Sequence, residues 1–403
     1  YIDRLVAELC PDGVEYRPLG ELLAYEQPTK YLVSSKDYDE SYPTPVLTAG
    51  KTFILGYTNE TEGIYPASEE EPVIIFDDFT TAFKWVEFPF KAKSSAMKML
   101  TLKSGTNSLF KYVYYAMQCI VYNSSDHARQ WISKYSNIEV PVPPMEIQEA
   151  IVEILDKFTN LEAELEAELE ARTLQYEYYR GSLFGALKDP VTGLPAIAGL
   201  VKTLCPDGVE YRSLKDVVAK NYGGGTPSKT KTEYWDGDIP WASVGDLSDG
   251  VLEVTDTRSK ITEEGVKGSS TNVVPAGAVI VAIKINPGRM KIAGMNLAIN
   301  QDIRGLVLNE FMNARFLTYY FRTLVFAGHG TIVKSITNKH LMETKIPVPP
   351  MEIQEAIVDI LDRFDALTSS LSEGLPAELA ARRSQYEYYR DQLLSFPRKG
   401  ENQ

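Results

Sequence analysis

Two long stretches of the chain carry apolar residues at helical spacing. In the first, large apolar residues recur every three or four positions, at Ile147, Ile151, Leu155, Phe158, Leu161, Leu165 and Leu169. The second stretch has the same spacing, at Ile353, Ile357, Leu361, Phe364, Leu367, Leu371, Leu375 and Leu379. This spacing predicts one apolar stripe along each of two helices, the first of which is about 40 residues long. Because two such stripes can cover each other, we expect a long antiparallel coiled-coil pair.

The helices belong to an internal repeat of three blocks. LCPDGVEYR occurs twice, PVPPMEIQEAIV begins at Pro141 and again at Pro347, and QYEYYR begins at Gln175 and again at Gln385. The second copy is four residues longer between the last two blocks. The repeat predicts a pseudo-two-fold arrangement of one frame built twice.

Local signals mark where the predicted helices begin and where one is interrupted. Pro144 and Glu146 suit a first helical turn, where no N–H bond is lost and a carboxylate meets the positive end of the helix dipole. In the second copy, Gly374 and Pro376 should bend or interrupt the helix.

The segments between the repeated blocks differ in sequence and predict two globular domains. Residues 22–139 and 218–345 mix β-branched and aromatic runs, such as EPVIIFDDF and AGAVIVAIKI, with Gly, Pro and Asn turns. Each also has a helix-like stretch near its end, LFKYVYYAMQCIV or ARFLTYYFRTLVF. We therefore predict a mixed α+β chain with α/β domains over 1–140 and 188–345, the latter beginning with a linker at 188–200, and spacer helices over 141–187 and 346–403.

Composition limits the class of protein. The net charge of −14 taken alone argues against a nucleic-acid partner, but residues 140–187 and 346–403 supply −7 and −4 of it, and residues 218–345 sum to +3. The longest apolar run is too short to span a membrane, and the N-terminus does not resemble a signal peptide, so we expect a cytoplasmic protein. Tyr1 in place of Met suggests a trimmed start.

Candidate catalytic motifs are incomplete. TAGKT at 48–52 lacks the first glycine of a P-loop, and the glycine-rich YGGGTPSK at 222–229 has no strand-then-helix context. The three histidines have no metal-ligand spacing, and Asp77 and Asp78 are followed by no nuclease-type ExK motif. The NPPF-like motif of amino-methyltransferases is absent. We expect no metal, no bound cofactor and no catalysis by this chain.

A binding surface is the remaining possibility. Lys and Arg neutralise phosphates, whereas Arg, Asn, Gln, Ser and Thr read base edges. In the first variable segment the candidate DNA-binding residues are Thr80, Thr81, Lys84, Lys91, Lys93, Ser94, Ser95, Lys98, His127, Arg129 and Gln130. In the second they are Thr226, Ser228, Lys229, Lys231, Lys284, Asn286, Arg289, Lys291, Asn300, Gln301 and Arg304.

This architecture resembles the specificity (S) subunit of type I restriction-modification systems. The resemblance rests on the duplicated PVPPMEIQEAIV, QYEYYR and CPDGVEYR blocks around two unlike segments and covers almost the whole chain. GGGTPSKTKTEYWDGDIPW is similar to the opening of target recognition domains in that family, and HARQWISKYSNIEVPVPP to the close of one.

The resemblance implies a non-catalytic DNA-recognition subunit for phage defence. Its two target recognition domains would each read one half of a bipartite, asymmetric double-stranded DNA target. The repeated helices would dock two modification (methyltransferase) subunits, which would hold S-adenosylmethionine, and restriction subunits would join the larger complex. We take Ile147, Ile151, Leu155, Phe158, Leu165, Ile353, Ile357, Leu361, Phe364 and Leu371 as the stripe for docking and spacing.

Helix length would then act as a ruler, so that removing the four extra residues, about 6 Å of helix, would change the preferred spacing of the half-sites. Alternative interpretations are a protein-interaction scaffold, an enzyme that uses the glycine-rich loop on a nucleotide, and a specificity subunit of a related system that cuts on both sides of its site.

Overall fold

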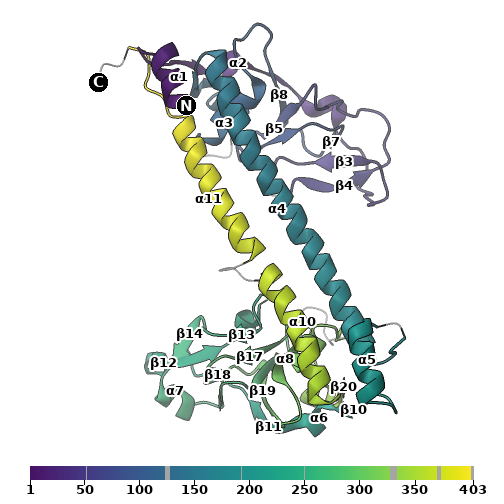
Figure 1. Ribbon diagram of the computed structural model, residues 1–403. Coiled ribbons are helices and arrows are strands. Elements are labelled where there is room, and N and C mark those ends of the chain that lie inside the picture. The colour runs from purple at the N-terminus through teal and green to yellow at the C-terminus, as the bar shows by residue number, and fades with distance from the viewer. Residues whose placement is uncertain are drawn as a thin grey trace. The chain divides into compact units, whose positions relative to one another are not determined.

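The computed structural model describes residues 1–50, 52–122, 128–191, 193–248, 250–326, 334–369 and 374–400. The chain forms two compact units, Tyr1–Ala163 with Ala381–Gln403, and Glu164–Ala380. Each unit contains one variable segment together with parts of the repeated helices (Figure 1). In the described ranges no helix is both long and apolar enough to cross a lipid bilayer.

The first unit is built on a four-stranded antiparallel sheet with apolar side chains on both faces. Its strands lie in the order β2 (Leu23–Glu26), β8 (Met97–Leu102), β5 (Val73–Asp77), β6 (Phe83–Val86). On β5, Ile74 and Phe76 belong to a core shared with α3 (Phe110–Gln118). Val73 and Ile75 belong to a second core on the other face. The continuous apolar run VIIF thus follows from burial of both faces. A smaller sheet lies beside this one, in the order β4 (Ile54–Thr58), β3 (Thr44–Leu47), β7 (Lys91–Ala92).

The second unit repeats this design with a different sequence. Its main sheet has the order β11 (Val218–Gly223), β19 (Ile303–Leu308), β16 (Val279–Ala282), β17 (Met290–Ala293), β13 (Glu253–Val254). Val279 and Val281 face the core that contains α8 (Ala314–Phe321), whereas Ile280 and Ala282 face another. Its smaller sheet has the order β14 (Ser259–Ile261), β12 (Trp235–Ala242), β18 (Leu297–Ile299), β15 (Val273–Val274).

The two variable segments therefore share a fold, although their sequences look unrelated. The order β2-β8-β5-β6 corresponds to β11-β19-β16-β17. Strands β5 and β16, like β8 and β19, begin 206 residues apart, the same separation as the PVPPMEIQEAIV blocks. Only the apolar pattern of these strands is kept, and that pattern is what a sheet buried on both faces requires.

Short elements frame the two segments. In each unit the strand before the variable segment pairs with the strand after it, β1 with β9 and β10 with β20. The two ends of each segment are therefore held side by side. The elements of the frame and the remaining helices are α1 (Ile2–Leu9), β1 (Glu15–Pro18), α2 (Leu19–Leu22), β9 (Glu139–Val142), α5 (Pro195–Leu204), β10 (Tyr211–Ser213), α6 (Leu214–Val217), α7 (Glu263–Lys267), α9 (Asn338–Glu343) and β20 (Lys345–Pro347). Short 3-10 helices cover Pro28–Tyr31, Tyr135–Asn137, Thr232–Tyr234 and Val244–Leu247.

The predicted linker at 188–200 is wrong in its second half. Helix α5 begins at Pro195, a residue suited to the first helical position. Ile197 and Val201 of α5 are buried in the core of the second unit. These apolar side chains anchor the segment, whereas a linker would leave them in water.

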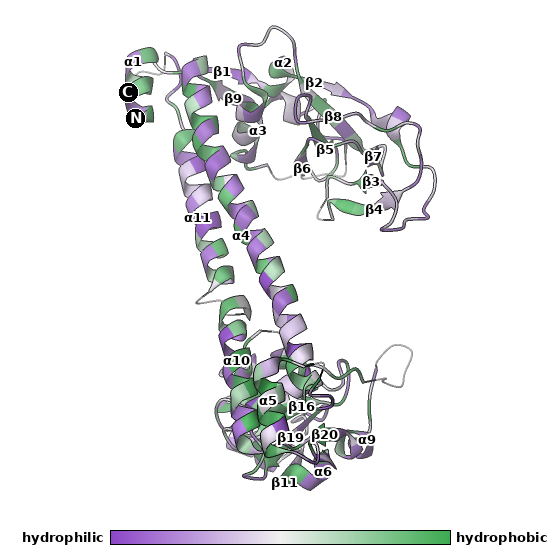
Figure 2. Cartoon of the chain, turned by 45° about the vertical axis from the view of Figure 1, so that its right-hand side comes forward, coloured by the Kyte–Doolittle hydropathy of each residue, from purple (hydrophilic) through white to green (hydrophobic). Residues whose placement is uncertain are grey.

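The predicted long helices are confirmed. Helix α4 (Met145–Gly185) has 41 residues, and the second copy consists of α10 (Met351–Ser369) and α11 (Leu375–Leu393). Hydrophobic and hydrophilic residues alternate along α4 and α11 (Figure 2). Gln148 and Gln354 bond the starts of the long helices to the domains formed by the variable segments 22–139 and 218–345. Gln148 accepts a bond from the Leu109 N–H (2.9 Å), and Gln354 accepts one from the Asn313 N–H (2.8 Å).

The first turns of the apolar stripe do not serve the helix pair. The fully buried residues are Ile147, Ile151, Leu155, Ile353, Ile357 and Leu361. They lie in the cores of the two units, among residues of α3 or α8. Their assignment to partner docking is therefore wrong, because the domains formed by the variable segments already cover them.

The helix pair is instead made by repeated aromatic residues. In the first unit Phe158 of α4 lies 6.4 Å and 5.6 Å, ring centre to ring centre, from Tyr386 and Tyr389 of α11. The second unit has the equivalent contacts, with Phe364 of α10 at 6.4 Å from Tyr176 and 5.1 Å from Tyr179 of α4. The early part of one repeat thus meets the late part of the other, as an antiparallel pair requires. The predicted pair is confirmed.

The second copy of the helix stops where Gly374 and Pro376 predicted an interruption. Helix α10 ends at Ser369, and α11 begins at Leu375. Gly374 has φ +84°, and a Cβ there would lie 2.7 Å from the carbonyl oxygens of Ala366 and Leu367. A positive φ at Gly374 does not fit a continuous α-helix through that residue, so the predicted interruption is confirmed. The dependence of half-site spacing on helix length stays a prediction. Leu371 lies outside the described residues.

Candidate nucleic-acid interface

The domain formed by each variable segment has an equivalent polar turn just before the central strand β8 or β19. In the first domain the Ala96 N–H donates to the Ser94 side chain (3.1 Å) and the Met97 N–H to the Ser94 carbonyl (3.1 Å). In the second domain the Asp302 and Ile303 N–H groups bond in the same way to Asn300 (3.1 and 3.2 Å). A short polar side chain closes each turn on its own backbone.

The residues at the turn tips, Ser95 and Gln301, are exposed. Ser94, Ser95, Asn300 and Gln301 were all predicted from sequence. The structure brings them into two equivalent places.

In the second domain the glycine-rich segment crosses this turn. The Gly225 N–H donates to the Ile299 carbonyl (2.9 Å), and the Thr226 hydroxyl donates to the Gln301 side chain. Gly224 passes so close that a Cβ would lie 1.8 Å from the Asn300 carbonyl oxygen. Glycine is therefore required for this approach of the two backbones, and the glycine-rich segment is a packed support for the turn.

Arg304 follows the turn on β19 and is partly buried. Its guanidinium donates twice to the Asn221 side-chain oxygen, at 2.9 and 2.7 Å. Burial lowers the pKa of the Arg304 guanidinium from its ordinary value, which still leaves it a cation at neutral pH. Thr226, Asn300, Gln301 and Arg304 thus form one polar cluster.

A hairpin tip lies beside each turn. The β5–β6 tip contains Thr80 and Thr81, and the β16–β17 tip contains Lys284 and Asn286. Lys284 lies 2.9 Å from Asp302, so the second tip is tied to the polar turn by an ion pair. Lys84 is exposed on β6, next to the first tip.

Other predicted residues lie apart from these clusters. Ser228 and Lys231 make local contacts, Ser228 with Thr230 and Lys231 with the Tyr234 hydroxyl (2.8 Å). The bond from Lys231 to Tyr234 raises the pKa of the Lys231 amine. Lys229 and Arg129 are exposed. Lys93 donates to the Tyr38 hydroxyl (2.9 Å), and His127 lies outside the described residues.

Three predicted contacts are corrected by burial. Lys91 lies 2.7 Å from Glu60 and also donates to the Glu62 carbonyl (2.7 Å). Lys98 has no exposed surface and lies 3.0 Å from the equally buried Asp78. Gln130 is fully buried and accepts a bond from the Tyr122 hydroxyl (2.7 Å). These side chains stabilise the first domain and have no surface to offer DNA, because a charge or amide inside a protein needs an internal partner.

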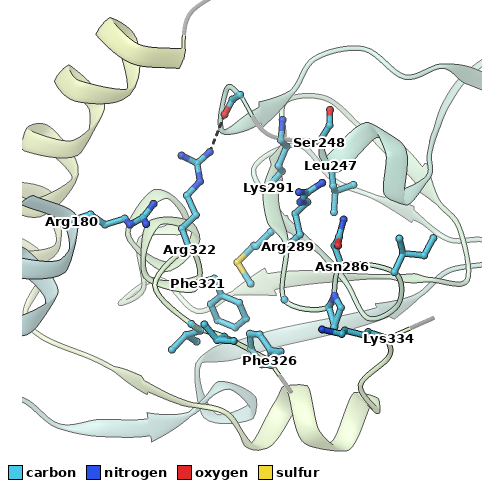
Figure 3. Close-up of a pocket in the computed structure, with 17 residues that line it drawn as sticks. Arg180, Leu247, Ser248, Asn286, Arg289, Lys291, Phe321, Arg322, Phe326 and Lys334 are labelled. Carbon is cyan, nitrogen blue, oxygen red and sulfur yellow. Dashed lines mark hydrogen bonds between the residues drawn. The ribbon is translucent and has the colours of Figure 1, made fainter. Parts of the chain in front are cut away.

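A cationic pocket of about 540 Å³ lies in the second unit. Figure 3 shows basic side chains from several elements around it. Among the lining residues are Arg180, Asn286, Arg289, Lys291, Arg322 and Lys334. Asn286, Arg289 and Lys291 were predicted from sequence, although Lys291 is mostly buried. Arg180, Arg322 and Lys334 were not predicted, because no sequence signal connects these three separate segments.

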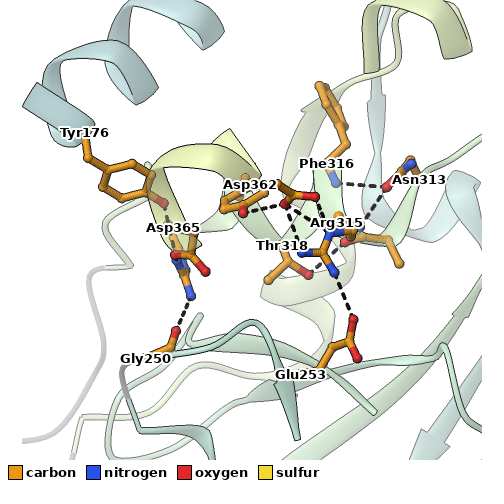
Figure 4. Close-up of polar contacts among 12 residues, drawn as sticks. Tyr176, Gly250, Glu253, Asn313, Arg315, Phe316, Thr318, Asp362 and Asp365 are labelled. Atoms are coloured by element: carbon orange, nitrogen blue, oxygen red, sulfur yellow. Dashed lines mark hydrogen bonds and ion pairs between the residues drawn. The ribbon is translucent and has the colours of Figure 1, made fainter. Parts of the chain in front are cut away.

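Polar contacts fix α8 against α10 beside this pocket (Figure 4). Arg315 donates to both oxygens of Asp362 (2.9–3.1 Å), and Arg322 lies 3.0 Å from Asp365. Burial would lower the pKa of Arg322, but Tyr176 and Asp365 raise it above its ordinary value. Burial and the hydrogen bond to Asp362 raise the pKa of Tyr319, so it stays a donor. This network holds the helix to the domain.

Of the described residues, no three or more His, Cys, Asp or Glu side chains are grouped so as to hold a metal ion.

Comparison with known proteins agrees with this architecture. A family model described as type I restriction modification DNA specificity domain matches residues 11–171 and 206–381. The EcoR124I/EcoR124II type I restriction enzyme specificity subunit of Escherichia coli is 45% identical over 99% of this chain and 97% of its own length. A putative type I specificity subunit of Haemophilus influenzae is 26% identical over 95% of this chain and 96% of its own length.

Solved structures share the fold. The S subunit of a type I restriction-modification system from M. genitalium superposes with a TM-score of 0.55 at 14% identity, covering 95% of this chain and 96% of its own. A chain from a study of assembly and conformational transition of the type I system gives 0.54 at 16% identity, covering 95% and 98%. With two matched domains around a repeated helical frame, the chain belongs to the family of type I restriction-modification DNA specificity proteins.

Proposed function

We propose that this chain is the DNA-recognition subunit of a type I restriction-modification complex and performs no catalysis itself. Its two recognition domains each read one half of a bipartite, asymmetric duplex DNA target. One observation carries this proposal: the same fold is present twice and offers unlike exposed polar side chains, Ser95 or Gln301, at the tips of equivalent turns.

Equivalent positions with different side chains support recognition of two different half-sites. An exposed amide side chain such as that of Gln301 can make paired bonds to adenine, whereas the hydroxyl of Ser95 bonds to several bases. The exposed basic residues serve to neutralise phosphates. Lys291 and Asn300 are left out of the revised set because they are buried. The revised set of candidate DNA contacts is Thr80, Thr81, Lys84, Lys93, Ser94, Ser95, Arg129, Thr226, Ser228, Lys229, Lys231, Lys284, Asn286, Arg289, Gln301 and Arg304.

The repeated frame is suited to binding two copies of one partner. The QYEYYR blocks place Tyr178 and Tyr388 at equivalent positions, and these side chains are 70% and 63% exposed. Exposed aromatic residues are typical of protein interfaces. We place one modification subunit on each tyrosine, with restriction subunits joining the complex. The methyl donor would bind the modification subunits, and the complex would work in the cytoplasm, where bacterial DNA lies.

Substituting these tyrosines one at a time tests the stoichiometry. We expect Tyr178→Ala and Tyr388→Ala each to remove one bound modification subunit at dilute concentration, and the double variant to remove both, as measured by native mass spectrometry. Leu174→Ala is the matched control, because Leu174 is 61% exposed on the same helix but is not repeated in the second copy. Full occupancy in all variants would refute this placement.

DNA binding by the assembled complex tests the function. The complex of this chain with its modification subunits should bind duplex DNA that carries its target, with an affinity that falls steeply as salt rises. Unrelated duplex should bind at least about a thousandfold more weakly at physiological salt. Equal, salt-independent binding to all duplexes, or no binding, would favour the scaffold interpretation. The 45% identity to a type I subunit supports type I over a system that cuts on both sides.

A further inference from the structure

We propose that Phe79 and Ile285 are apolar wedges, one in each recognition domain, that insert into the base stack of the two half-sites. This inference rests on the proposed function and adds a mode of contact that the polar candidate residues do not include. Both side chains project from the hairpin tips beside the polar turns, and they are 42% and 54% exposed.

The two residues occupy the same place in the shared fold. Phe79 follows β5 and Ile285 follows β16, and they are separated by the same 206 residues as these strands. Every residue of β16 and the first four of β5 are buried. A large, partly exposed apolar side chain thus stands two or three residues after each buried strand, at the same position in two segments of unlike sequence.

Both tips have a strained backbone. In the described ranges three non-glycine residues have positive φ, and two of them are Thr81 (φ 59°) and Ile285 (φ 71°). Both are β-branched, the type that tolerates this region least. Such strain persists only where the surrounding structure enforces it, and it is concentrated at functional sites.

Polar anchors hold each tip rigid. In the first domain the Asp77 carboxylate accepts bonds from the Phe79 and Thr80 N–H groups (2.9 and 2.8 Å). The next residue, Asp78, forms the buried ion pair with Lys98 of β8.

The second domain has an equivalent anchor, in which a cation replaces the carboxylate at the tip. Lys284 occupies the position of Asp78 and pairs with Asp302, the residue before β19. The Ile285 N–H donates to the Lys334 carbonyl (2.9 Å). In both domains the hairpin tip is therefore held in place, although by different residues. A side chain that separates stacked bases must be held rigidly in this way.

The surroundings favour DNA over a protein partner. Thr80, Thr81 and Lys84 flank Phe79, whereas Lys284, Asn286 and Lys334 flank Ile285. Architectural proteins use the same combination of polar or basic residues around an apolar wedge. A partner present in two copies would require the same residue on both domains, as the repeated tyrosines provide. Phe79 and Ile285 differ, as the two half-sites should.

Fluorescence of 2-aminopurine placed in turn at each target position tests the wedges. The complex of the full chain with its modification subunits should unstack one base step in each half-site, seen as increased fluorescence. Phe79→Ala should abolish the signal in one half-site and Ile285→Ala in the other, each with about tenfold weaker target binding. Phe79→Leu should retain both effects in part. Phe311→Ala, another 42% exposed phenylalanine, is the control and should change neither.

The possible outcomes are distinguishable. Alanine variants that bind the target and unstack it like the wild type would overturn the wedges and leave the proposed function standing. Variants that keep DNA affinity but lose modification subunits would identify the tips as a protein contact, which also overturns the inference. A wild-type complex without target-specific binding would overturn the proposed function together with this inference. Unfolding curves of each variant confirm that the exposed substitutions leave the fold intact.

Discussion

Replacing residues 22–139 by the recognition segment of another family member should change one half of the DNA target and leave the other half unchanged. The segment is clasped by the β1–β9 pair, which lies almost wholly in the repeated frame, so the exchange preserves the junction. Specific binding exceeds non-specific binding by about 10³–10⁷-fold. Methylation of the original target should therefore fall to background.

The exchange must preserve the core that helix α4 shares with the first domain. Ile147, Ile151 and Leu155 of α4 pack in the core that contains α3, so the donor segment needs apolar residues at the positions that face them. The matched control exchanges residues 218–345 and should change only the opposite half-site. Sequencing of methylated motifs measures both. Loss of both half-sites after a single exchange, in a folded complex, would contradict independent reading by the two domains.

Lys98→Met should destabilise the first recognition domain by about 3–5 kcal/mol, because it leaves the Asp78 carboxylate buried without its cation. Both side chains are fully buried, 3.0 Å apart, in the sheet next to the first tip. A loss of this size is a large part of the stability of a single domain. Urea unfolding followed by the fluorescence of Trp131, which is buried in this domain, measures it.

The double variant Asp78→Asn with Lys98→Met provides the control. Asparagine keeps the side-chain oxygen that accepts a hydrogen bond from the backbone N–H of Trp131 (2.8 Å). Neither of the two substituted residues then carries a charge. Stability should return to within about 1–2 kcal/mol of the wild type, since an apolar replacement of a buried pair is often nearly neutral. Wild-type stability of the single variant would show that Lys98 is not needed inside the domain, and would reopen its assignment to DNA.

Helices and their interruption could be predicted because they depend on local signals. The spacing of Ile147 to Leu169 defines a helix face, Pro144 suits its start, and Gly374 interrupts the second copy through its own backbone angle. Periodicity does not say what covers a face. The first turns of the stripe are buried in the core of the first domain, whereas Phe158 packs against the other helix.

The candidate site could be predicted only in part, for a similar reason. Ser95 and Gln301 were found because polar residues in turns are exposed by default. Lys98 looked like a phosphate contact because nothing in the sequence places Asp78 opposite it across the sheet. Phe79 and Ile285 were missed because an apolar residue beside a strand normally belongs to the core. Their exposure depends on the hairpin geometry.

Mapping methylated bases in the DNA of cells that carry this chain with its modification subunits, against cells that lack the chain, tests the central claim most directly. We expect one methylated motif that depends on this chain and consists of two unlike half-sites separated by a spacer of fixed length and variable sequence. A palindromic or uninterrupted motif, or methylation unchanged by removing the chain, would contradict recognition by two unlike domains on a repeated frame.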